Sequence, residues 1–439
     1  MVSFSNPEAI PTVYPMRPGF IKGEFYVTLR PYTRRGGVLT AVFNVTDEKL
    51  HKQIKSPIAP IFSLTSAVSF EGLIDDVLEC LRGKFDQRFA INSEIFDLGQ
   101  WLQFFAFDVM GTMTFSKRYG FLDNGRDVGG MLAAVVTFMR SAAPMTQAPW
   151  LDKILWKNFI ADTLRQKFNR TASLSILSFV GKAIKEKQEK LATGGDSSTR
   201  ADRKDFLTRY IEIQQGNPEI PHWAPTAWTF SNVIAGSDSV GTIMRTIVFN
   251  LLSYPHTLEK LYEELRAANL SRPFPRYSQV RDLPYLDACV QEGSRMHPPF
   301  ALPFERVVPE GGITILGHYL PAGTVVGGSP YVVNRHQGTF GQDAEFWRPE
   351  RWLEGDAAHK KKLEQGILTF GAGRRVCLGK NVGILEIKKI IPFLVLNYDM
   401  HVIDREKFTV ENSWFFFQSG FYAQIQKRPE VAENGAVNL

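Results

Sequence analysis

The sequence predicts a mainly α-helical protein with small β-sheets attached, an α+β fold. Apolar residues recur at helical spacing over five long stretches, whereas alternating apolar and polar residues are confined to short segments near 312–326 and 415–425. Helices and strands do not alternate regularly, which excludes a repeated βαβ architecture. The five helical stretches are 97–115, 173–191, 225–253, 256–268 and 283–296.

Composition and charge narrow the class of protein. We expect one domain over residues 1–439, with an exposed loop at 191–204 and a flexible tail at 429–439. The net charge is +6, but no basic run is interleaved with aromatic residues, so nucleic acid is not an expected partner. The sequence contains no run of about 18 consecutive apolar residues, so it predicts no membrane span.

The three cysteines, Cys80, Cys289 and Cys377, are too few and too far apart for a disulfide framework or a zinc site. Cys80 and Cys289 lie in helical patterns with apolar neighbours, which favours core positions. At least one thiol is therefore available for another role.

Cys377 lies in a glycine-rich segment, Phe-Gly-Ala-Gly-Arg-Arg-Val-Cys-Leu-Gly (370–379), followed by a helical pattern from 380 to 396. Glycines let the backbone approach a flat ligand closely. A cysteine just before a helix N-terminus is stabilised as a thiolate, the form that ligates heme iron. Arg375 is placed to meet an anionic group of that ligand, such as a heme propionate. The alternative is a buried, inert cysteine beside a turn.

This segment resembles the heme-binding signature of the cytochrome P-450 family, Phe-x-x-Gly-x-Arg-x-Cys-x-Gly, at every fixed position. The resemblance implies a cytochrome P-450 fold that binds heme b. Cys377 would be the axial ligand of the iron, and Phe370, Gly371 and Gly379 would contact the cofactor.

Glu292 and Arg295 lie three residues apart, so they share one face of a helix. Such a pair alone is usually a surface salt bridge. Its flanks, 283–285 and 296–299, resemble the family's Glu-x-x-Arg helix. The resemblance implies a buried structural network of Glu292, Arg295 and Arg351.

Residues 235–239, Ala-Gly-Ser-Asp-Ser, interrupt the long 225–253 helix with weak helix formers. Small residues there serve either close packing or a local opening of the helix. The resemblance implies that Asp238 and Ser239 are an acid–alcohol pair that relays protons to iron-bound oxygen. Ser239 stands where threonine is usual, so its rotamer is less restricted.

Further cationic and apolar positions follow from the resemblance. Arg306, His51 and Lys55 match positions that contact heme propionates. The ammonium group of Lys55 cannot form the bidentate hydrogen bonds of an arginine. A solvated helix face is the alternative for His51 and Lys55. We expect an apolar pocket for a lipophilic substrate, although each lining position also suits ordinary core packing. The expected lining is Phe230, Val233, Gly236, Phe300, Ala301, Leu302 and part of 414–417.

The predicted activity is that of a monooxygenase that consumes O2 and receives electrons from NADPH through a flavoprotein reductase. Arg374, Lys380, Lys388 and Lys389 are candidate contacts for that partner. Residues 101–122 resemble filamentous-fungal microsomal members of the pisatin demethylase type, which implies secondary metabolism.

The resemblance also implies the cytosolic face of the endoplasmic reticulum membrane. In relatives, however, an anchor helix precedes the segment that resembles the start of this chain. We therefore expect an N-terminally shortened fold, with membrane association only if an anchor is present and a soluble cytoplasmic protein otherwise.

Two other functions stay open at this point. One is a heme-binding remnant with little or no turnover. The other is a heme-thiolate isomerase or dehydratase that uses no O2, although such relatives tend to lose the acid–alcohol pair that Asp238 and Ser239 preserve.

Overall fold

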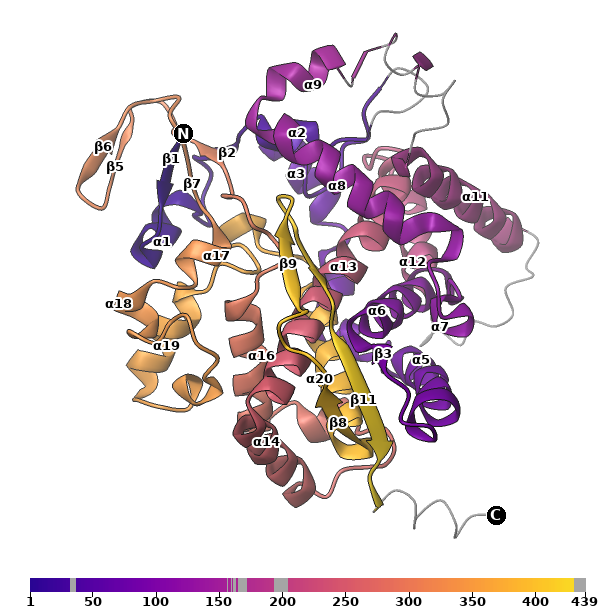
Figure 1. Ribbon diagram of the computed structural model, residues 1–439. Coiled ribbons are helices and arrows are strands. Elements are labelled where there is room, and N and C mark those ends of the chain that lie inside the picture. Colours follow the sequence, from indigo (N-terminus) through magenta and orange to yellow (C-terminus); the bar gives the residue numbers. More distant parts are fainter. Residues whose placement is uncertain are drawn as a thin grey trace.

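The computed structural model describes residues 1–31, 37–155, 157–158, 160, 163–164, 172–192 and 204–429. Within this part of the chain the fold is mainly helical with four small sheets, as predicted (Figure 1). The elements up to residue 192 are β1 (Val2–Phe4), η1 (Pro7–Ala9), α1 (Ile10–Val13), β2 (Ile21–Lys22), α2 (Phe25–Thr28), α3 (Glu48–Lys55), η2 (Ala59–Phe62), α4 (Leu64–Val68), α5 (Glu71–Lys84), η3 (Phe85–Ala90), β3 (Phe96–Asp97), α6 (Leu98–Phe115), α7 (Phe121–Asn124), η4 (Val128–Gly130), α8 (Met131–Gln147), α9 (Pro149–Leu155) and α11 (Ala172–Ala192).

The second half of the chain carries the longest helix and most of the strands. Its elements are α12 (Phe206–Gln215), α13 (Ala224–Ser253), α14 (Pro255–Ala267), α15 (Tyr277–Val280), α16 (Pro284–Met296), β4 (Arg306–Val307), β5 (Ile313–Ile315), β6 (His318–Leu320), β7 (Val325–Gly328), α17 (Pro330–Val333), α18 (Gln337–Phe340), η6 (Pro349–Trp352), α19 (Ala357–Gly366), η7 (Gly373–Arg375), α20 (Lys380–Asn397), β8 (Tyr398–Val402), β9 (Thr409–Asn412), β10 (Phe416–Ser419) and β11 (Tyr422–Lys427).

The five predicted long helices are present as α6, α11, α13, α14 and α16. Local chemistry sets their ends. The Asp97 side chain accepts from the Gln100 N–H and caps α6, and Pro255 separates α13 from α14. Helix α11 continues to Ala192 and so includes the first two residues of the predicted loop at 191–204. Residues 193–203 of that loop and residues 430–439 of the predicted tail lie outside the described residues.

The sheets depart from the prediction in one respect. The alternating segment near 415–425 does contain two strands, but they do not pair with each other: β10 pairs with β9, whereas β11 pairs with β8 and β3. Gly420, at φ +79°, turns the chain between β10 and β11, so the two strands enter different sheets. The first sheet has the order β1-β7-β4-β2, and β5 and β6 form a separate hairpin at that end of the molecule (Figure 1).

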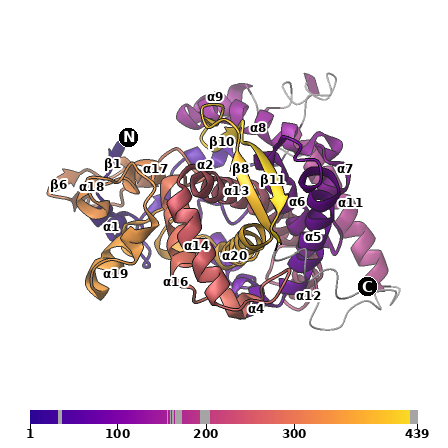
Figure 2. The same cartoon turned by 60° about the horizontal axis from the view of Figure 1, so that its bottom comes forward.

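Helix α13 lies in the interior, where it packs against α6, α16 and α20 (Figure 2). Glycine permits the close approach of α16 to α13, because a Cβ on Gly293 would lie 2.2 Å from Cγ1 of Ile247. Because α20 begins directly after the Cys377 segment, this packing holds the cysteine loop opposite the middle of α13.

Among the described residues, one helical stretch, Val128–Gln147, is long and apolar enough to cross a membrane. The sequence has no unbroken apolar run of that length, as expected, and this helix meets the criterion because a mean hydropathy tolerates scattered polar residues. One helix of this kind is weak evidence for a span, and Val135 and Met139 of this helix face the cavity described next.

Candidate heme-thiolate site

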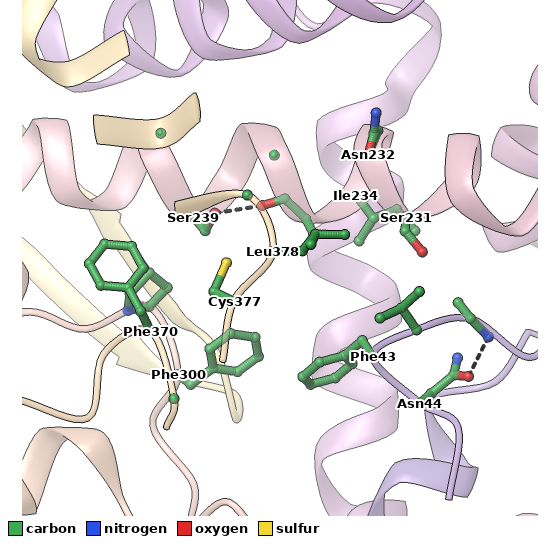
Figure 3. Close-up of a pocket in the computed structure, with 18 of the residues that line it drawn as sticks. Phe43, Asn44, Ser231, Asn232, Ile234, Ser239, Phe300, Phe370, Cys377 and Leu378 are labelled. Atoms are coloured by element: carbon green, nitrogen blue, oxygen red, sulfur yellow. Dashed lines mark hydrogen bonds between the residues drawn. The ribbon is translucent and has the colours of Figure 1, made fainter. Parts of the chain in front are cut away.

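One cavity of about 340 Å³ lies between the cysteine loop and α13. Figure 3 shows the sulfur of Cys377 directed into this space, with Phe370, Phe300 and Phe43 around it and Ser239 on the helix beyond. Apolar and aromatic side chains dominate the wall, and cations gather at one part of it. The cavity therefore suits a large, flat ligand with an apolar body and an acidic edge.

The loop around Cys377 is fixed by its own backbone. The Cys377 N–H donates to the Phe370 carbonyl at 2.7 Å, and Gly371 and Gly373 take φ values of +67° and +60°. A Cβ on Gly373 would lie 2.0 Å from the Tyr14 carbonyl oxygen, so the N-terminal segment passes directly against the loop. Gly379, in contrast, has φ −81° and needs no such freedom.

The Cys377 side chain is open to the cavity although it lies deep in the protein. Burial raises the pKa of its thiol. Hydrogen bonds from the backbone N–H groups of Gly379 and Lys380, together with the charge of Lys55, oppose that rise. These donors are the partners a thiolate ligand of iron requires.

The cations predicted at the ligand's acidic edge all line the cavity: Arg306, Arg375, Lys55 and His51. Arg375 donates to Glu48 at 2.6 Å, and Arg306 donates to the Tyr26 hydroxyl at 3.2 Å. Lys55 donates to the Arg374 carbonyl at 2.8 Å, which ties α3 to the cysteine loop. The solvated-face interpretation of His51 and Lys55 is therefore wrong.

His51 is 4% exposed, and burial together with the nearby cations lowers its pKa to about 2. It is therefore a neutral donor rather than a charge. A neutral imidazole can donate a hydrogen bond to an acceptor at this edge but does not neutralise its charge.

Sequence reasoning missed Lys22, which lines the same part of the cavity. Its ammonium group donates to the Phe43 carbonyl and lies 3.9 Å from the centre of the Tyr26 ring. Burial, followed by the charges of Arg306 and Arg375, lowers its pKa well below the ordinary value. An anion beside it would reverse that effect. No local motif marks this lysine, and only the pairing of β2 with β4 brings it beside Arg306.

Glu386 of α20 was also missed. It is fully buried, lines the cavity, and neither carboxylate oxygen has a hydrogen-bond partner among the described residues. Burial raises its pKa well above the ordinary value, which favours the protonated carboxyl. The available signal was a glutamate in the apolar run Ile384-Leu385-Glu386-Ile387.

Opposite the cysteine loop, α13 is helical throughout, so the local opening, one of the two alternatives for residues 235–239, is not seen. The Ser239 hydroxyl lines the cavity and donates to the Ala235 carbonyl at 2.5 Å, which satisfies the backbone without breaking the helix. Gly236 serves packing, because a Cβ there would lie 2.2 Å from Cε of Met110 on α6.

Asp238 does not line the cavity with Ser239, because consecutive residues of a helix point in different directions. It faces α6 and accepts from the Gln103 side-chain amide. Burial raises the pKa of Asp238 to about 7, against the charge of Arg245 and the Gln103 hydrogen bond. The predicted acid and alcohol are therefore neighbours in sequence that face different surroundings.

Three of the six predicted pocket residues, Phe230, Gly236 and Phe300, line the cavity, as do Trp414 and Phe415. The other three, Val233, Ala301 and Leu302, do not. Val233 lies on a different face of α13 and packs in the adjoining hydrophobic cluster, as Leu302 does. The backbone of Ala301 bonds to the Trp414 carbonyl and the Ser329 hydroxyl.

Away from the cavity, the structure brings Glu292, Arg295 and Arg351 together, each at most 2% exposed. Arg295 forms a fork with both Glu292 oxygens at 2.8 Å, and Arg351 donates to the same carboxylate at 3.0 Å. The remaining guanidinium N–H groups bond to backbone carbonyls between 334 and 346.

Two of the four expected contacts for a reductase are not available at the surface. Lys388 is 5% exposed and paired with Asp287, and Lys389 is fully buried between Glu71 and Asp75 at 2.8 Å. The period of α20 explains this, because both lysines fall on faces covered by other helices. Arg374 is half-buried and Lys380 is exposed.

A thiol backed by N–H donors, in an apolar cavity with a cationic edge, defines a heme-thiolate protein. Comparison with known proteins agrees: the Cytochrome P450 family model matches residues 1–422, and the chain belongs to that family.

The relatives give the activity. The chain is 73% identical to cytochrome P450 monooxygenase mfmA of Annulohypoxylon moriforme, over 98% of this chain and 84% of the relative. It is 49% identical to cytochrome P450 monooxygenase AFLA_114810 of Aspergillus flavus, over 100% of this chain and 86% of that protein. It is 53% identical to cytochrome P450 monooxygenase mpaDE' of Penicillium brevicompactum, over 98% of this chain and 50% of that protein. The chain is a cytochrome P450 monooxygenase, which inserts one atom of O2 into an organic substrate.

Proposed function

We propose that residues 1–439 form one catalytic domain in which Cys377 ligates the iron of heme b. The supporting observation is the cavity itself, where the Cys377 sulfur and a cluster of cations face the same apolar space. When bound, heme supplies an iron that binds and activates O2.

The chain's own residues hold the cofactor. Phe370, Gly371 and Gly379 shape the loop around the thiolate. Arg306, Arg375, Lys55 and Lys22 meet the two propionates, and neutral His51 donates a hydrogen bond. Glu48 is the carboxylate that contacts this cluster, through Arg374 and Arg375, so the cluster keeps an excess of positive charge for an anionic partner.

We propose that Ser239 and Asp238 deliver the protons that the reaction consumes. The Ser239 hydroxyl is in the cavity, and Asp238, one residue earlier, has a pKa near neutrality and can both take up and release a proton. This pair favours a monooxygenase over an O2-independent isomerase or dehydratase.

The substrate we propose is a lipophilic small molecule of fungal secondary metabolism, in keeping with the fungal relatives and a resemblance to the pisatin demethylase type. Phe230, Phe300, Trp414 and Phe415 give it aromatic surface. NADPH supplies electrons through a flavoprotein reductase, for which Arg374 and Lys380 on the cysteine side are the remaining expected contacts.

We propose that the protein works at the cytosolic face of the endoplasmic reticulum. Apolar side chains on α9 support contact with a lipid surface: Trp150 and Ile154 are 62% and 61% exposed. Co-sedimentation with phosphatidylcholine vesicles that is lost in Trp150→Ser, and unaffected in the exposed-side-chain control Tyr319→Ser on β6, supports this. Equal binding of both variants contradicts it.

The carbon-monoxide spectrum of the reduced protein tests the axial ligand. A thiolate-type spectrum that disappears in Cys377→Ala, but persists in Cys80→Ala, supports the assignment. O2 consumption during turnover then separates a monooxygenase from an isomerase, and a thiolate spectrum without NADPH-dependent product indicates an inactive heme protein.

The alcohol is tested by Ser239→Ala. Because the hydroxyl is lost from the cavity wall, we expect slower turnover and diversion of reducing equivalents to H2O2. Unchanged coupling of NADPH to product contradicts the role of Ser239.

A further inference from the structure

Asp238 is the first member of a buried polar chain that joins α13 to α6. The Gln103 amide nitrogen donates to Oδ1 of Asp238, and the Gln103 amide oxygen accepts from Nη1 of Arg245 at 2.6 Å. Arg245 lies on α13, two turns after Asp238. Gly241 lies between them on the face that packs against α6, where a Cβ would make an ordinary contact of 3.6 Å with Cα of Gln103.

The two ends of this chain fix the orientation of the Gln103 amide. Its NH2 group must face the carboxylate and its oxygen must face the guanidinium, because the reverse orientation would place donor against donor and acceptor against acceptor. One half-buried amide thus connects two buried charged groups, Asp238 at 3% and Arg245 at 5% exposed.

The two oxygens of Asp238 are in different situations. Oδ1 is held by Gln103, whereas Oδ2 is buried and has no hydrogen-bond partner among the described residues. A buried carboxylate oxygen without a partner is costly unless it binds water or a proton. Oδ2 is therefore the oxygen free to exchange protons.

The charges around the carboxyl are few. Arg245 is the charged group that acts on Asp238, and Asp97, at the start of α6, acts in turn on Arg245. Gln418 of β10 is neutral and contacts Arg245 through its backbone carbonyl.

We propose that Gln103 and Arg245 are positioning residues that hold Oδ1 of Asp238, so that Oδ2 supplies protons toward Ser239 and O2 consumption stays coupled to product formation. Neither an amide nor a guanidinium releases a proton at neutral pH, so the two act through Asp238 rather than as carriers. This inference rests on the proposed proton delivery by Asp238 and Ser239.

Coupling gives the functional test. In the coupled reaction, substrate, O2, NADPH and H⁺ give hydroxylated product, water and NADP⁺; in the uncoupled one, O2, NADPH and H⁺ give H2O2 and NADP⁺. We expect Gln103→Leu to lower the ratio of product to NADPH about tenfold, the factor typical of a lost hydrogen bond to a charged group. Heme content and substrate affinity should not change. Gln100→Leu, one turn earlier on the exposed face of α6, is the matched control.

Infrared titration gives a readout independent of turnover. The protonated Asp238 carboxyl is assigned by the C=O band that disappears in Asp238→Asn. Because the Gln103 hydrogen bond and the Arg245 charge both favour the carboxylate, we expect the midpoint of this band to rise in Gln103→Leu and in Arg245→Gln. The double variant Gln103→Leu/Asp238→Asn should couple no worse than Asp238→Asn alone.

The outcomes separate the two proposals. If Asp238→Asn couples as well as the wild type, the proton delivery itself is wrong. If Asp238→Asn uncouples while Gln103→Leu keeps wild-type coupling and midpoint, only the positioning role is wrong. Should Gln103→Leu not fold, Gln103→Glu decides the question, because it preserves the acceptor for Arg245 and replaces the donor to Asp238 with a like charge; normal coupling in that variant overturns the inference.

Discussion

The molecule contains two buried acid–arginine networks, and they differ in how fully they are satisfied. In the first, both oxygens of Glu292 accept from Arg295, and together they accept further bonds from the Arg351 guanidinium, the Trp352 indole and the Arg348 backbone. In the second, Oδ2 of Asp238 and Nε of Arg245 have no partner among the described residues.

This difference separates a network that stabilises the fold from one that can exchange a proton. An ion pair whose donors and acceptors are all bonded loses stability when any of those bonds is broken. Such a pair serves to hold segments of the fold in place. An unsaturated one retains an atom for water or a proton, at a cost to stability. The Glu292 network joins α16 to the 334–351 segment before the cysteine loop, whereas the Asp238 network borders the helix face opposite Cys377.

The largest effect should come from breaking the saturated network. Arg295→Ala leaves Glu292 buried with fewer partners, which typically costs about 3–5 kcal/mol. We expect protein that lacks heme and unfolds at lower denaturant concentration, measured by heme content and urea titration. Lys260→Ala, which removes an exposed partner of Glu350, is the control and should cost less than about 1 kcal/mol. Normal heme content in Arg295→Ala would refute the structural role.

Breaking the unsaturated network should lower activity without lowering stability. Asp238→Asn is expected to lower product formation about 100-fold, the usual range for loss of an acid–base group. The free energy of unfolding should stay the same or increase, because a poorly paired buried carboxyl is removed. Product formation and urea unfolding are measured on the same preparation. A loss of stability comparable to that of Arg295→Ala contradicts the distinction between the networks.

The pH dependence of stability gives a further test of the Asp238 network. The pKa of Asp238 is raised in the folded state to about 7 from an ordinary 3.8. Between these values the folded protein holds a proton that the unfolded chain releases, so this group makes stability fall as pH rises from about 4 to 7. Asp238→Asn should make the slope of unfolding free energy against pH less negative in that window, as followed by urea titration at several pH values. An identical slope in the two proteins contradicts the raised pKa.

The smallest effect should come from Ser239→Thr. Threonine keeps the hydroxyl and its bond to the Ala235 carbonyl, and its β-branch restricts the rotamer. We expect turnover within about twofold of the wild type and a modest gain in coupling, measured as product per NADPH. A large loss of coupling indicates that the cavity wall has no room for the added methyl group.

The sequence was sufficient for features that depend on local pattern. Apolar spacing placed α6, α13 and α16 within a residue of their observed ends, and the Cys377 segment located the loop. The failures involve tertiary contacts. Lys22 joins the cations only through β2–β4 pairing, Lys388 and Lys389 are covered by neighbouring helices, and the partner of Asp238 comes from Gln103 on another helix.

The close approach of Gly373 to the Tyr14 carbonyl has a consequence for biosynthesis. Tyr14 leaves the ribosome well before Gly373, so the wall of the cysteine loop is assembled from two segments that are far apart in the nascent chain. The segment that contains Tyr14 therefore lacks this partner until Gly373 has been made. We expect a deletion or insertion that displaces Tyr14 to reduce cofactor loading rather than block chain synthesis.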